Sequence, residues 1–297
     1  EAVKAISEFA IALGINVPTG KDSLSMKQKY PDGDVLSPGT VIISAAGQCD
    51  DITKVVEPVF KKEKGSIYYL NLSQDNFKLG GSSFAQIHSK VGNDAPNVID
   101  AKGVVTAFNT IQDLIKLNKI VAGHDVASGG LITTLLEMCF ADNNLGAELD
   151  ITALNESNSS KILFAENTGI VFQSVDDSIE AILSDAGVSY EKIGRVTESN
   201  TLNIKNGNES LSLSISELRD IWFKTSYLFD KEQTLNNLAE ERYKNYKKQP
   251  LRYKFPQTYS ENGIFPLGED RDGAPKAAIL REKGSNSERE MANAIIG

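Results

Sequence analysis

Residues 120–139, IVAGHDVASGGLITTLLEMC, constrain the fold more than any other part of the chain. Residues 120–122 are apolar and typical of a short buried strand. From residue 131 to residue 140 apolar side chains recur at helical spacing, which predicts a helix. Ser128 lies just before that helix and is a candidate N-cap. This part of the chain is therefore predicted to run from a strand, through a polar turn, into a helix.

The turn itself has the composition of a phosphate site. His124 and Asp125 follow the predicted strand, and Gly129 and Gly130 precede the predicted helix. Free N–H groups and the positive end of the helix dipole favour an anion at such a turn. Asp125 would repel a bare phosphate, so we expect a Mg²⁺ ion between them, held by one carboxylate and by phosphate oxygens. A capping aspartate with glycines that only permit close packing fits the same residues equally well.

A second polar loop, residues 20–26 (GKDSLSM), carries groups that suit phosphate chemistry. Lys21 could contact a phosphate, Asp22 a metal ion and Ser23 a substrate oxygen. The loop lacks the spaced first glycine of a Walker motif. Taken alone it fits a polar turn with a capping aspartate better than a site.

Net charge and hydropathy exclude several classes of protein. The formal charge of −9 and the pI near 5.0 argue against a nucleic-acid or anionic-membrane partner, since either would require a basic surface. No apolar run approaches the ~20 residues of a membrane helix, and the chain shows no signal-peptide pattern. Cys49 and Cys139 lie in apolar surroundings without metal-ligand spacing, and we expect both to be buried free thiols. These features favour a cytoplasmic protein.

The remaining patterns favour an α+β fold. Strands are predicted at residues 40–48, 66–72, 146–151, 169–174 and 190–196, and helices at residues 1–14, 84–91, 103–117, 178–186 and 216–229. Asn206-Gly207 predicts a hairpin between strands 201–205 and 211–214. His88 is expected to be an exposed or capping residue, and Trp222 a core or interface anchor. Strands and helices in mixed order favour α+β over a doubly wound sheet.

Both ends of the sequence lie inside predicted helices. The chain opens at Glu1, without an initiator methionine, in an amphipathic helix. Near its other end, residues 276–280 are predicted to form a short strand and Ser287 to cap a final helix, which is how an α/β domain begins. We therefore expect the sequence to be a fragment of a longer chain.

Four stretches together resemble the family of large, single-chain phosphoribosylformylglycinamidine synthases. They are residues 20–26 (GKDSLSM), 79–86 (LGGSSFAQ), 124–131 (HDVASGGL) and 278–292 (AILREKGSNSEREMA). Their order and spacing fit the family over the whole chain. The resemblance implies that formylglycinamide ribonucleotide, ATP and glutamine give the amidine, ADP, phosphate and glutamate. ATP would phosphorylate the amide oxygen of the substrate, and ammonia would displace that phosphate.

The resemblance also implies an aminoimidazole ribonucleotide synthetase-like fold. Residues 1–60 would end the second N-terminal-like subdomain, and residues 61–225 would form the second C-terminal-like subdomain. Residues 226–272 would be a linker, and residues 273–297 the start of a class I glutaminase domain. The glutaminase nucleophile would fall outside the 297 residues, so we do not expect this chain to hydrolyse glutamine. The upstream synthetase half and the rest of the glutaminase domain would be its partners within one longer chain.

Site residues follow from the same resemblance. Lys21, Asp22 and Ser23 would help to form the synthetase active site. Asp125 would be a Mg²⁺ ligand of a nucleotide site, with His124 and residues 127–130 (Ala127, Ser128, Gly129 and Gly130) contacting ATP or ADP. The family often has Ser-Asp where this chain has Ala127 and Ser128, so a hydroxyl contact is lost or moves to Ser128.

Two functional hypotheses remain open at this point. In the first, residues 21–23 contribute to catalysis by an ATP-dependent amide ligase. In the second, the chain is a nucleotide-stabilised structural half of that enzyme, inactive alone, because a bound nucleotide that is not hydrolysed stabilises the fold by mass action. A related synthetase of the same fold, such as selenophosphate synthetase, is a weaker third reading that the glutaminase-like end argues against.

Overall fold

The structure is a computed structural model that describes residues 2–21, 26–37, 39–49, 51–141, 144–248, 254, 276–284 and 286–296. The chain divides into two compact units, Glu1–Gln233 and Thr234–Gly297. Each unit is described by itself below, and the first contains the candidate site.

Within the described residues of the first unit, seven strands form one sheet. The strands are β3 (Ile67–Asn71), β4 (Ile120–Val126), β5 (Gly146–Asp150), β6 (Gly169–Ser174), β7 (Glu191–Thr197), β8 (Thr201–Asn206) and β9 (Glu209–Ser214). Their order across the sheet is β4-β6-β3-β7-β5-β8-β9. The pairing of β5 with β8 is parallel and the other neighbours are antiparallel. The predicted α+β class is thus confirmed.

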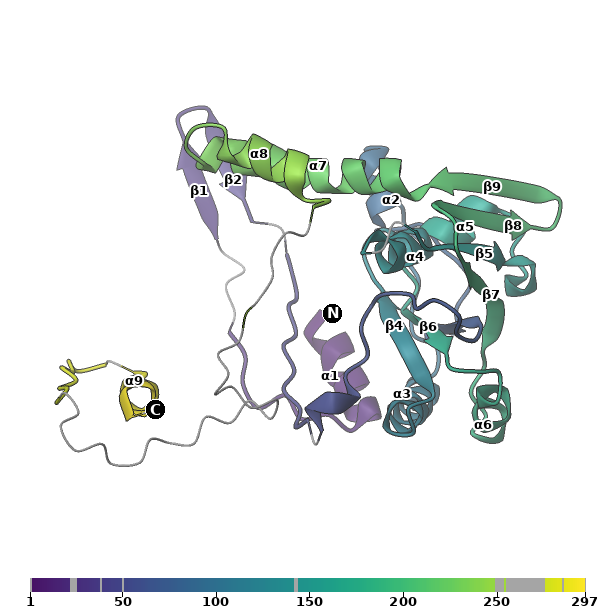
Figure 1. The fold of residues 1–297 in the computed structure, drawn as a ribbon, viewed down its shortest axis with the longest axis horizontal. Coiled ribbons are helices and arrows are strands. Elements are labelled where there is room, and N and C mark those ends of the chain that lie inside the picture. Colours follow the sequence, from purple (N-terminus) through teal and green to yellow (C-terminus); the bar gives the residue numbers. More distant parts are fainter. Residues whose placement is uncertain are drawn as a thin grey trace. The chain divides into compact units, whose positions relative to one another are not determined.

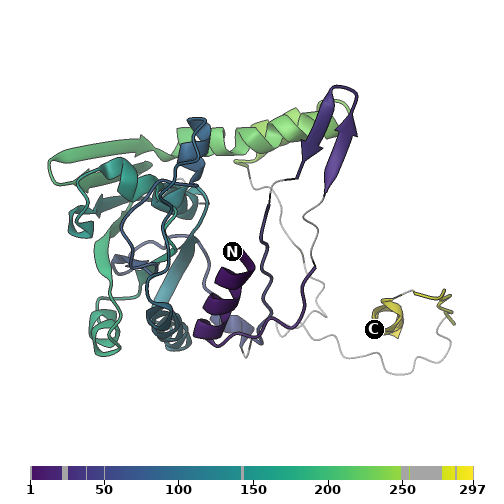
Figure 2. The same cartoon turned by 180° about the vertical axis from the view of Figure 1, so that it is seen from behind.

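Helices cover both faces of this sheet (Figures 1 and 2). One face packs against α4 (Gly130–Phe140) and α5 (Ser159–Phe164), and the other against α3 (Ala101–Lys116) and α6 (Ile179–Asp185). Because successive side chains of a strand point to opposite faces, Ile67 and Tyr69 join the first core and Tyr68 and Leu70 the second. The unbroken apolar run of β3 is therefore the signature of a strand buried on both sides.

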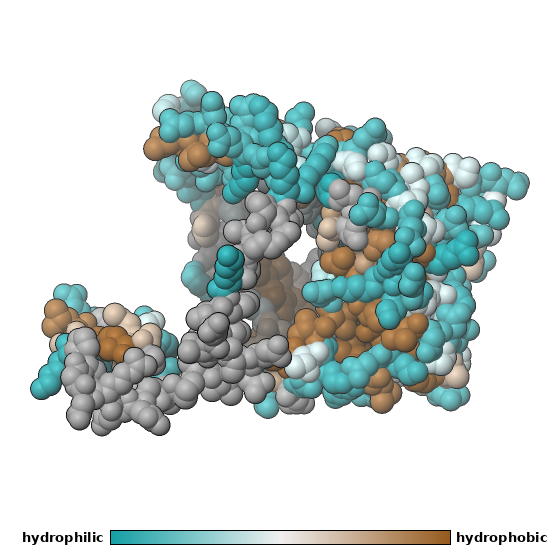
Figure 3. Space-filling model, in the orientation of Figure 1, coloured by the Kyte–Doolittle hydropathy of each residue, from teal (hydrophilic) through white to brown (hydrophobic). Residues whose placement is uncertain are grey.

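Local signals fix several element ends. The Asp100 side chain accepts a hydrogen bond from the N–H of Lys102 and caps α3. Gly207 has φ +58° in the turn between β8 and β9, which confirms the predicted hairpin. Hydrophilic residues cover the edge of the sheet that β9 forms (Figure 3). Charged or polar side chains protect such an edge from pairing with a strand of another chain. A short helix, α2 (Ser83–Ile87), ends at His88, which is exposed as predicted.

Residues 2–49 differ from the prediction in two places. Helix α1 (Ala2–Leu13) forms as expected and contacts α3. Residues 27–36, for which no strand was predicted, form a hairpin of β1 (Lys27–Tyr30) and β2 (Gly33–Leu36). The strand predicted at residues 40–48 is wrong: described residues 39–49 form no strand and are exposed. A β-prone run becomes a strand only when another strand pairs with it, and here none of the described residues does.

The two cysteines differ in exposure. Cys139 is 1% exposed on α4, and burial raises the pKa of its thiol to about 12. Cys49 is exposed, so the prediction of a second buried thiol is wrong. The reason is the same as for the missing strand, since Cys49 follows the unpaired run.

The remaining elements are short or lie near the carboxyl end. Single 3₁₀ turns occur at Ile52–Lys54 and Thr152–Leu154, and helix α7 (Ile215–Gln233) closes the first unit. The second unit contains α8 (Leu238–Asn245) and α9 (Glu288–Ile296), the latter close to the predicted final helix. The strand expected at residues 276–280 does not form, and Leu280 is 96% exposed. In the described parts of the chain no helix is long and apolar enough to span a bilayer.

Candidate functional site

The candidate site lies where β4 leads into α4. Strand β4 runs four residues further than expected. His124 and Asp125 therefore belong to the end of the strand, where they pair with Val171 and Ile170 of β6. The Asp125 side chain is 76% exposed, whereas that of His124 is 22% exposed. The end of the strand thus presents a carboxylate to solvent beside a largely covered imidazole.

Two glycines make the turn, and Ser128 does not cap the helix. Gly129 is the N-cap of α4, with φ +90°, and no side chain caps it in the usual way, so the prediction for Ser128 is wrong. Ser128 and Ala127 are both exposed. Gly130 has φ +74°, and a Cβ there would lie 2.7 Å from the carbonyl oxygen of Leu163. Only glycine fits this position without strain, because the turn lies directly against the end of α5.

The carboxylate of Glu166 accepts a hydrogen bond from the turn that the sequence predicts to be a phosphate site. Its Oε1 accepts the N–H of Gly129 at 2.8 Å and also the N–H of Ser83, at the start of α2, at 2.7 Å. A carboxylate is favoured at a helix amino end for the same reason as a phosphate. One side chain therefore joins the glycine turns of residues 80–83 and 127–130.

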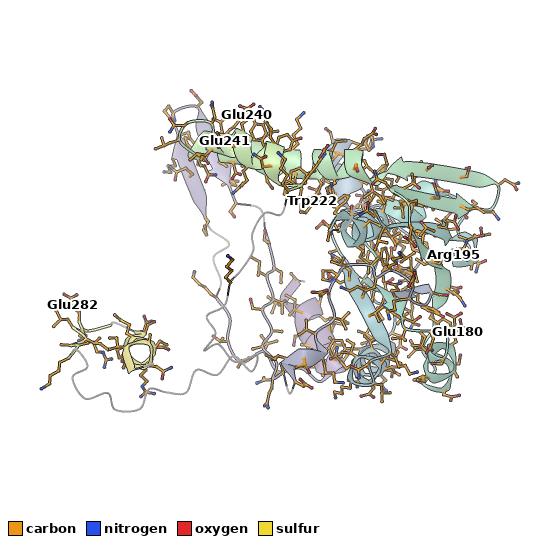
Figure 4. The ribbon with its side chains drawn as sticks, viewed as in Figure 1. Glu180, Arg195, Trp222, Glu240, Glu241 and Glu282 are labelled. Atoms are coloured by element: carbon orange, nitrogen blue, oxygen red, sulfur yellow. The ribbon has the colours of Figure 1, made fainter. Side chains whose placement is uncertain are left out.

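His124 is oriented by Asp125, its neighbour on β4, and by Glu137 on α4. Its Nδ1 lies 2.8 Å from the carbonyl oxygen of Asp125 and 3.2 Å from Asp125 Oδ1, and its Nε2 lies 3.3 Å from Glu137 Oε2 on α4. Trp222 lies on α7 (Figure 4), and its indole Nε1 donates to Glu137 Oε1 at 3.0 Å. Trp222 is 47% exposed and packs on Phe140, so it anchors α7 to α4 at the surface.

Buried polar groups hold the backbone around Glu166. Asn167 is fully buried, and its Nδ2 donates to Ser73 Oγ at 2.9 Å and to the carbonyl oxygens of Asp75 and Asn76. The ammonium group of Lys78 and the N–H of Asn97 both bond the Asp75 carboxylate and hold its pKa below the ordinary value. These contacts fix the segment that carries Glu166.

A pocket of about 360 Å³ opens beside Glu166. Its lining combines apolar and polar residues: Ala5, Ile6, Phe9, Ser73, Pro96, Asn97, Val98, Glu166 and Thr168. The carboxylate that joins the two turns thus also borders a cavity next to α1.

The residues at the end of β4 fit a magnesium ion only in company with phosphate. Among the described residues, no group of three or more His, Cys, Asp or Glu side chains could hold a metal ion. Mg²⁺ usually keeps several waters and takes one or two carboxylates together with phosphate oxygens. The exposed Asp125 carboxylate meets that requirement, and a complete protein cage is not needed.

The structure brings together only part of the predicted site. His124, Asp125 and residues 127–130 form one turn, whereas Lys21 is exposed on a separate segment and Asp22 and Ser23 lie outside the described residues. The roles of Lys21, Asp22 and Ser23 stay predictions. Glu166 and Glu137 were missed because each acts on residues distant in sequence, and no local spacing signals such a contact.

Family comparisons agree with this architecture. Residues 67–205 match the family described as "AIR synthase related protein, C-terminal domain", and residues 1–48 match the "FGAR-AT PurM_N-like domain". The first match covers the strands from β3 to β8 and therefore the whole candidate site.

Curated relatives match nearly the whole chain. A probable phosphoribosylformylglycinamidine synthase of Arabidopsis thaliana, named as chloroplastic/mitochondrial, is 37% identical over 99% of this chain and 21% of its own length. The Homo sapiens phosphoribosylformylglycinamidine synthase is 35% identical over 99% of this chain and 22% of its own length. The chain thus spans less than a quarter of the length of these relatives.

The likeness to two solved structures is weak. "T. maritima PurL complexed with ATP" is 12% identical, with a TM-score of 0.49 over 73% of this chain and 35% of that chain. "T. maritima PurL complexed with FGAR" is 13% identical, with a TM-score of 0.48 over 73% of this chain and 36% of that chain. A likeness at this level supports no ligand assignment. The sequence matches along the whole chain do identify the family: the chain belongs to the phosphoribosylformylglycinamidine synthases.

Proposed function

We propose that this chain is part of an ATP-dependent amide ligase of purine biosynthesis. The enzyme converts formylglycinamide ribonucleotide, glutamine and ATP to formylglycinamidine ribonucleotide, ADP, phosphate and glutamate. The observation that carries the proposal is the match to plant and human phosphoribosylformylglycinamidine synthases over 99% of the chain, at 37% and 35% identity.

The end of β4 is the proposed nucleotide site. Asp125 would hold Mg²⁺, and the ion would neutralise charge on the phosphates of ATP or ADP. His124, Ala127, Ser128, Gly129 and Gly130 would contact the nucleotide from the same turn. Support comes from the exposure of the Asp125 carboxylate and from the orientation of His124 by Glu137.

The chemistry needs positioning and charge neutralisation more than a side-chain nucleophile. The amide oxygen of the substrate attacks the γ-phosphorus of ATP, and the bond to ADP breaks. Ammonia then attacks the amide carbon, and phosphate leaves with the former amide oxygen. Lys21, Asp22 and Ser23 are proposed to serve the phosphoryl-transfer step, because lysine and hydroxyl groups stabilise charge on a transferring phosphoryl group.

The alternative is a structural role for the bound nucleotide. Asp125 would then hold a nucleotide that is never hydrolysed, and the chain would be inactive alone. A ligand that binds only the folded state stabilises it by ~2.7 kcal/mol at a hundred times its dissociation constant. Asp125 is exposed and lies on a different segment from Lys21. This separation fits a catalytic role for Lys21 together with a structural role for the nucleotide at Asp125.

Two variants of the full-length enzyme separate these roles. If residues 21–23 are catalytic, Lys21→Ala should lower kcat by ~100-fold or more, the size expected for losing one charge-stabilising group. If the Asp125 nucleotide is structural, Asp125→Asn should lower the melting temperature in ADP and Mg²⁺ while turnover of the remaining folded enzyme stays unchanged. Normal turnover in Lys21→Ala favours the purely structural role for this chain. Unchanged nucleotide binding in Asp125→Asn contradicts the proposed site.

The subdomain boundaries remain part of the proposal. Residues 1–60 and 61–225 would be the two synthetase subdomains, residues 226–272 the linker and residues 273–297 the beginning of the glutaminase domain, which would supply ammonia. Limited proteolysis of the full-length enzyme should cut within residues 226–272 first. The expectation of a cytoplasmic protein also stands as a prediction, and imaging of the tagged protein tests it.

A further inference from the structure

One carboxylate oxygen holds both glycine turns of the first unit. Glu166 Oε1 accepts the N–H of Ser83 at 2.7 Å and the N–H of Gly129 at 2.8 Å. These two turns lie in two of the four stretches that resemble the family, and the chain separates them by more than forty residues. Their geometry is thus set by a third segment, which neither motif contains.

The carboxylate cannot leave this position without loss. Gly130 lies against the carbonyl oxygens of Leu163 and Ala165, and Asn167 is fully buried with its Nδ2 hydrogen bonded. The backbone on both sides of Glu166 is therefore fixed. Rotation of the side chain would leave the N–H groups of Ser83 and Gly129 without their acceptor, and an unpaired backbone donor is costly.

The amino end of α4 favours a negative charge, and the Glu166 carboxylate already supplies one there. The Glu166 carboxylate lies at the amino end of α4, bonded to the N–H of Gly129, and the Asp125 carboxylate lies on β4 just before the same turn. Like charges at short range repel, and an intervening divalent cation reverses the sign of the interaction. The N–H of Gly129 is engaged by the protein itself and is not the group that attracts the phosphate.

We propose that Glu166 is a positioning residue that makes nucleotide binding at this turn conditional on a divalent cation. It fixes the backbone of both turns, and its charge disfavours a nucleotide that arrives without Mg²⁺. This inference rests on the proposed nucleotide site, and it assigns to Glu166 the selection of the Mg²⁺ complex over the free nucleotide.

Calorimetric titration of the full-length protein with ADP tests the inference. Each protein is titrated in excess Mg²⁺ and again in EDTA, and the ratio of the two dissociation constants gives the Mg²⁺ preference. Glu166→Gln keeps an oxygen acceptor for both N–H groups but removes the charge. We expect its Mg²⁺ preference to fall by ~10-fold, mainly through tighter binding in EDTA. A factor of ten corresponds to a shift of one pKa unit, which we take as the effect of removing one nearby charge. Asp125→Asn, measured in parallel, identifies the isotherm that belongs to this site.

Two further variants separate charge from structure. Glu156→Gln is the matched control, since Glu156 also accepts a backbone N–H, that of Asn158 at 2.9 Å, away from the glycine turns. It should leave the Mg²⁺ preference unchanged. Glu166→Asp keeps the charge and should keep most of the preference, even if shorter reach loosens the turns. Hydrogen exchange of the Ser83 and Gly129 amides should rise together in Glu166→Asp.

The outcomes are distinct. A purely structural role for Glu166 would weaken ADP binding equally with and without Mg²⁺, and this result in Glu166→Gln overturns the inference while the nucleotide site stands. Loss of the Mg²⁺ preference in Glu166→Asp also contradicts it and remains measurable if Glu166→Gln fails to fold. No ADP binding at an Asp125-dependent site of the unaltered protein overturns the proposed site and the inference with it.

Discussion

Two apolar runs of similar composition have opposite fates in this protein. Residues 66–72 (SIYYLNL) contain the interior strand β3, in which Ile67 to Leu70 are at most 1% exposed. Residues 40–46 (TVIISAA) form no strand, and Val41, Ile42 and Ile43 are 54%, 83% and 63% exposed. Strand propensity is high in both runs, so propensity alone does not decide the outcome. The first run has neighbouring strands on both sides and helices over both faces.

The same contrast extends to whole regions. Residues 66–214, the sheet region, bury apolar side chains in two cores. Residues 2–49 are the leading region, and its described part (2–21, 26–37 and 39–49) contains no buried residue in any helix or strand. Each region has an isoleucine, a cysteine, a glycine with positive φ and an ion-paired aspartate that can be compared directly.

Thiol reactivity should show the largest difference. Cys139 is buried with a raised pKa of about 12, and Cys49 is exposed. Because the thiolate is the reactive form, alkylation of Cys139 at pH 8 should be at least ~100-fold slower than that of Cys49. Mass spectrometry after timed iodoacetamide treatment gives both rates. Equal rates in the folded protein would show that residue 49 is covered in solution, and both thiols should react in urea.

The isoleucine pair tests the contrast in stability. Ile67→Ala removes a fully buried side chain from β3 and should lower the free energy of unfolding by ~2–5 kcal/mol. Ile43→Ala removes an exposed side chain and should change it by less than ~0.5 kcal/mol. Urea denaturation of both variants measures the difference. A large effect of Ile43→Ala would show that residues 40–46 pair with a partner strand in solution.

The glycine pair separates backbone strain from crowding. Gly14 and Gly130 have φ +72° and +74°, but only Gly130 has atoms within 3 Å of an added Cβ. Gly14→Ala should therefore cost only the ~1 kcal/mol of the left-handed backbone. Gly130→Ala should cost ~2 kcal/mol or more, because the turn must also move away from Leu163 and Ala165. Thermal unfolding distinguishes the two, and equal costs would mean that the turn shifts freely.

The aspartate pair should show the smallest effect. The hydrogen bonds from Lys78 and Asn97 lower the folded-state pKa of Asp75, so its contribution to stability is complete above the unfolded pKa of ~3.9 and is lost as pH falls through the lower folded value. The melting temperature of Asp75→Asn should lie below that of the unaltered protein at pH 5, and the gap should close toward pH 2. Asp34, half-exposed and paired with Lys27, provides the control: Asp34→Asn should leave the melting temperature nearly unchanged. A gap for Asp75→Asn that persists at pH 2 would contradict the assignment.

The sequence predicted the sheet region well because each of its elements has a strong local signal. Alternation or unbroken apolar runs marked the strands, and Asn206-Gly207 marked the hairpin. The errors at residues 40–48 and 276–280 have one cause, since a strand needs a partner that no local pattern reveals. The hairpin of residues 27–36 was missed for the opposite reason: Pro31-Asp32-Gly33 supplies a turn, but the flanking KQKY and GDVL lack clear alternation.

The candidate site was predictable only where it is local. His124, Asp125 and the glycine pair stand together in sequence and in the structure. Ser128 was a reasonable cap, yet the positive φ of Gly129 moves the helix start one residue on. Glu166 lies 37 residues from Gly129 and 83 from Ser83, and no spacing rule connects them. The sequence therefore indicated where an anion is favoured but not that the protein supplies one itself.

The strand order also has a consequence for synthesis on the ribosome. Strand β3 precedes its neighbours β6 and β7 by roughly 100 residues along the chain. At a translation rate of 5–20 residues per second, β3, with four consecutive buried residues, is therefore made about 5–20 s before its partners. During that interval its exposed edges invite association with other nascent chains, so a chaperone that shields residues 67–71 would protect the yield of folded protein more than its final stability.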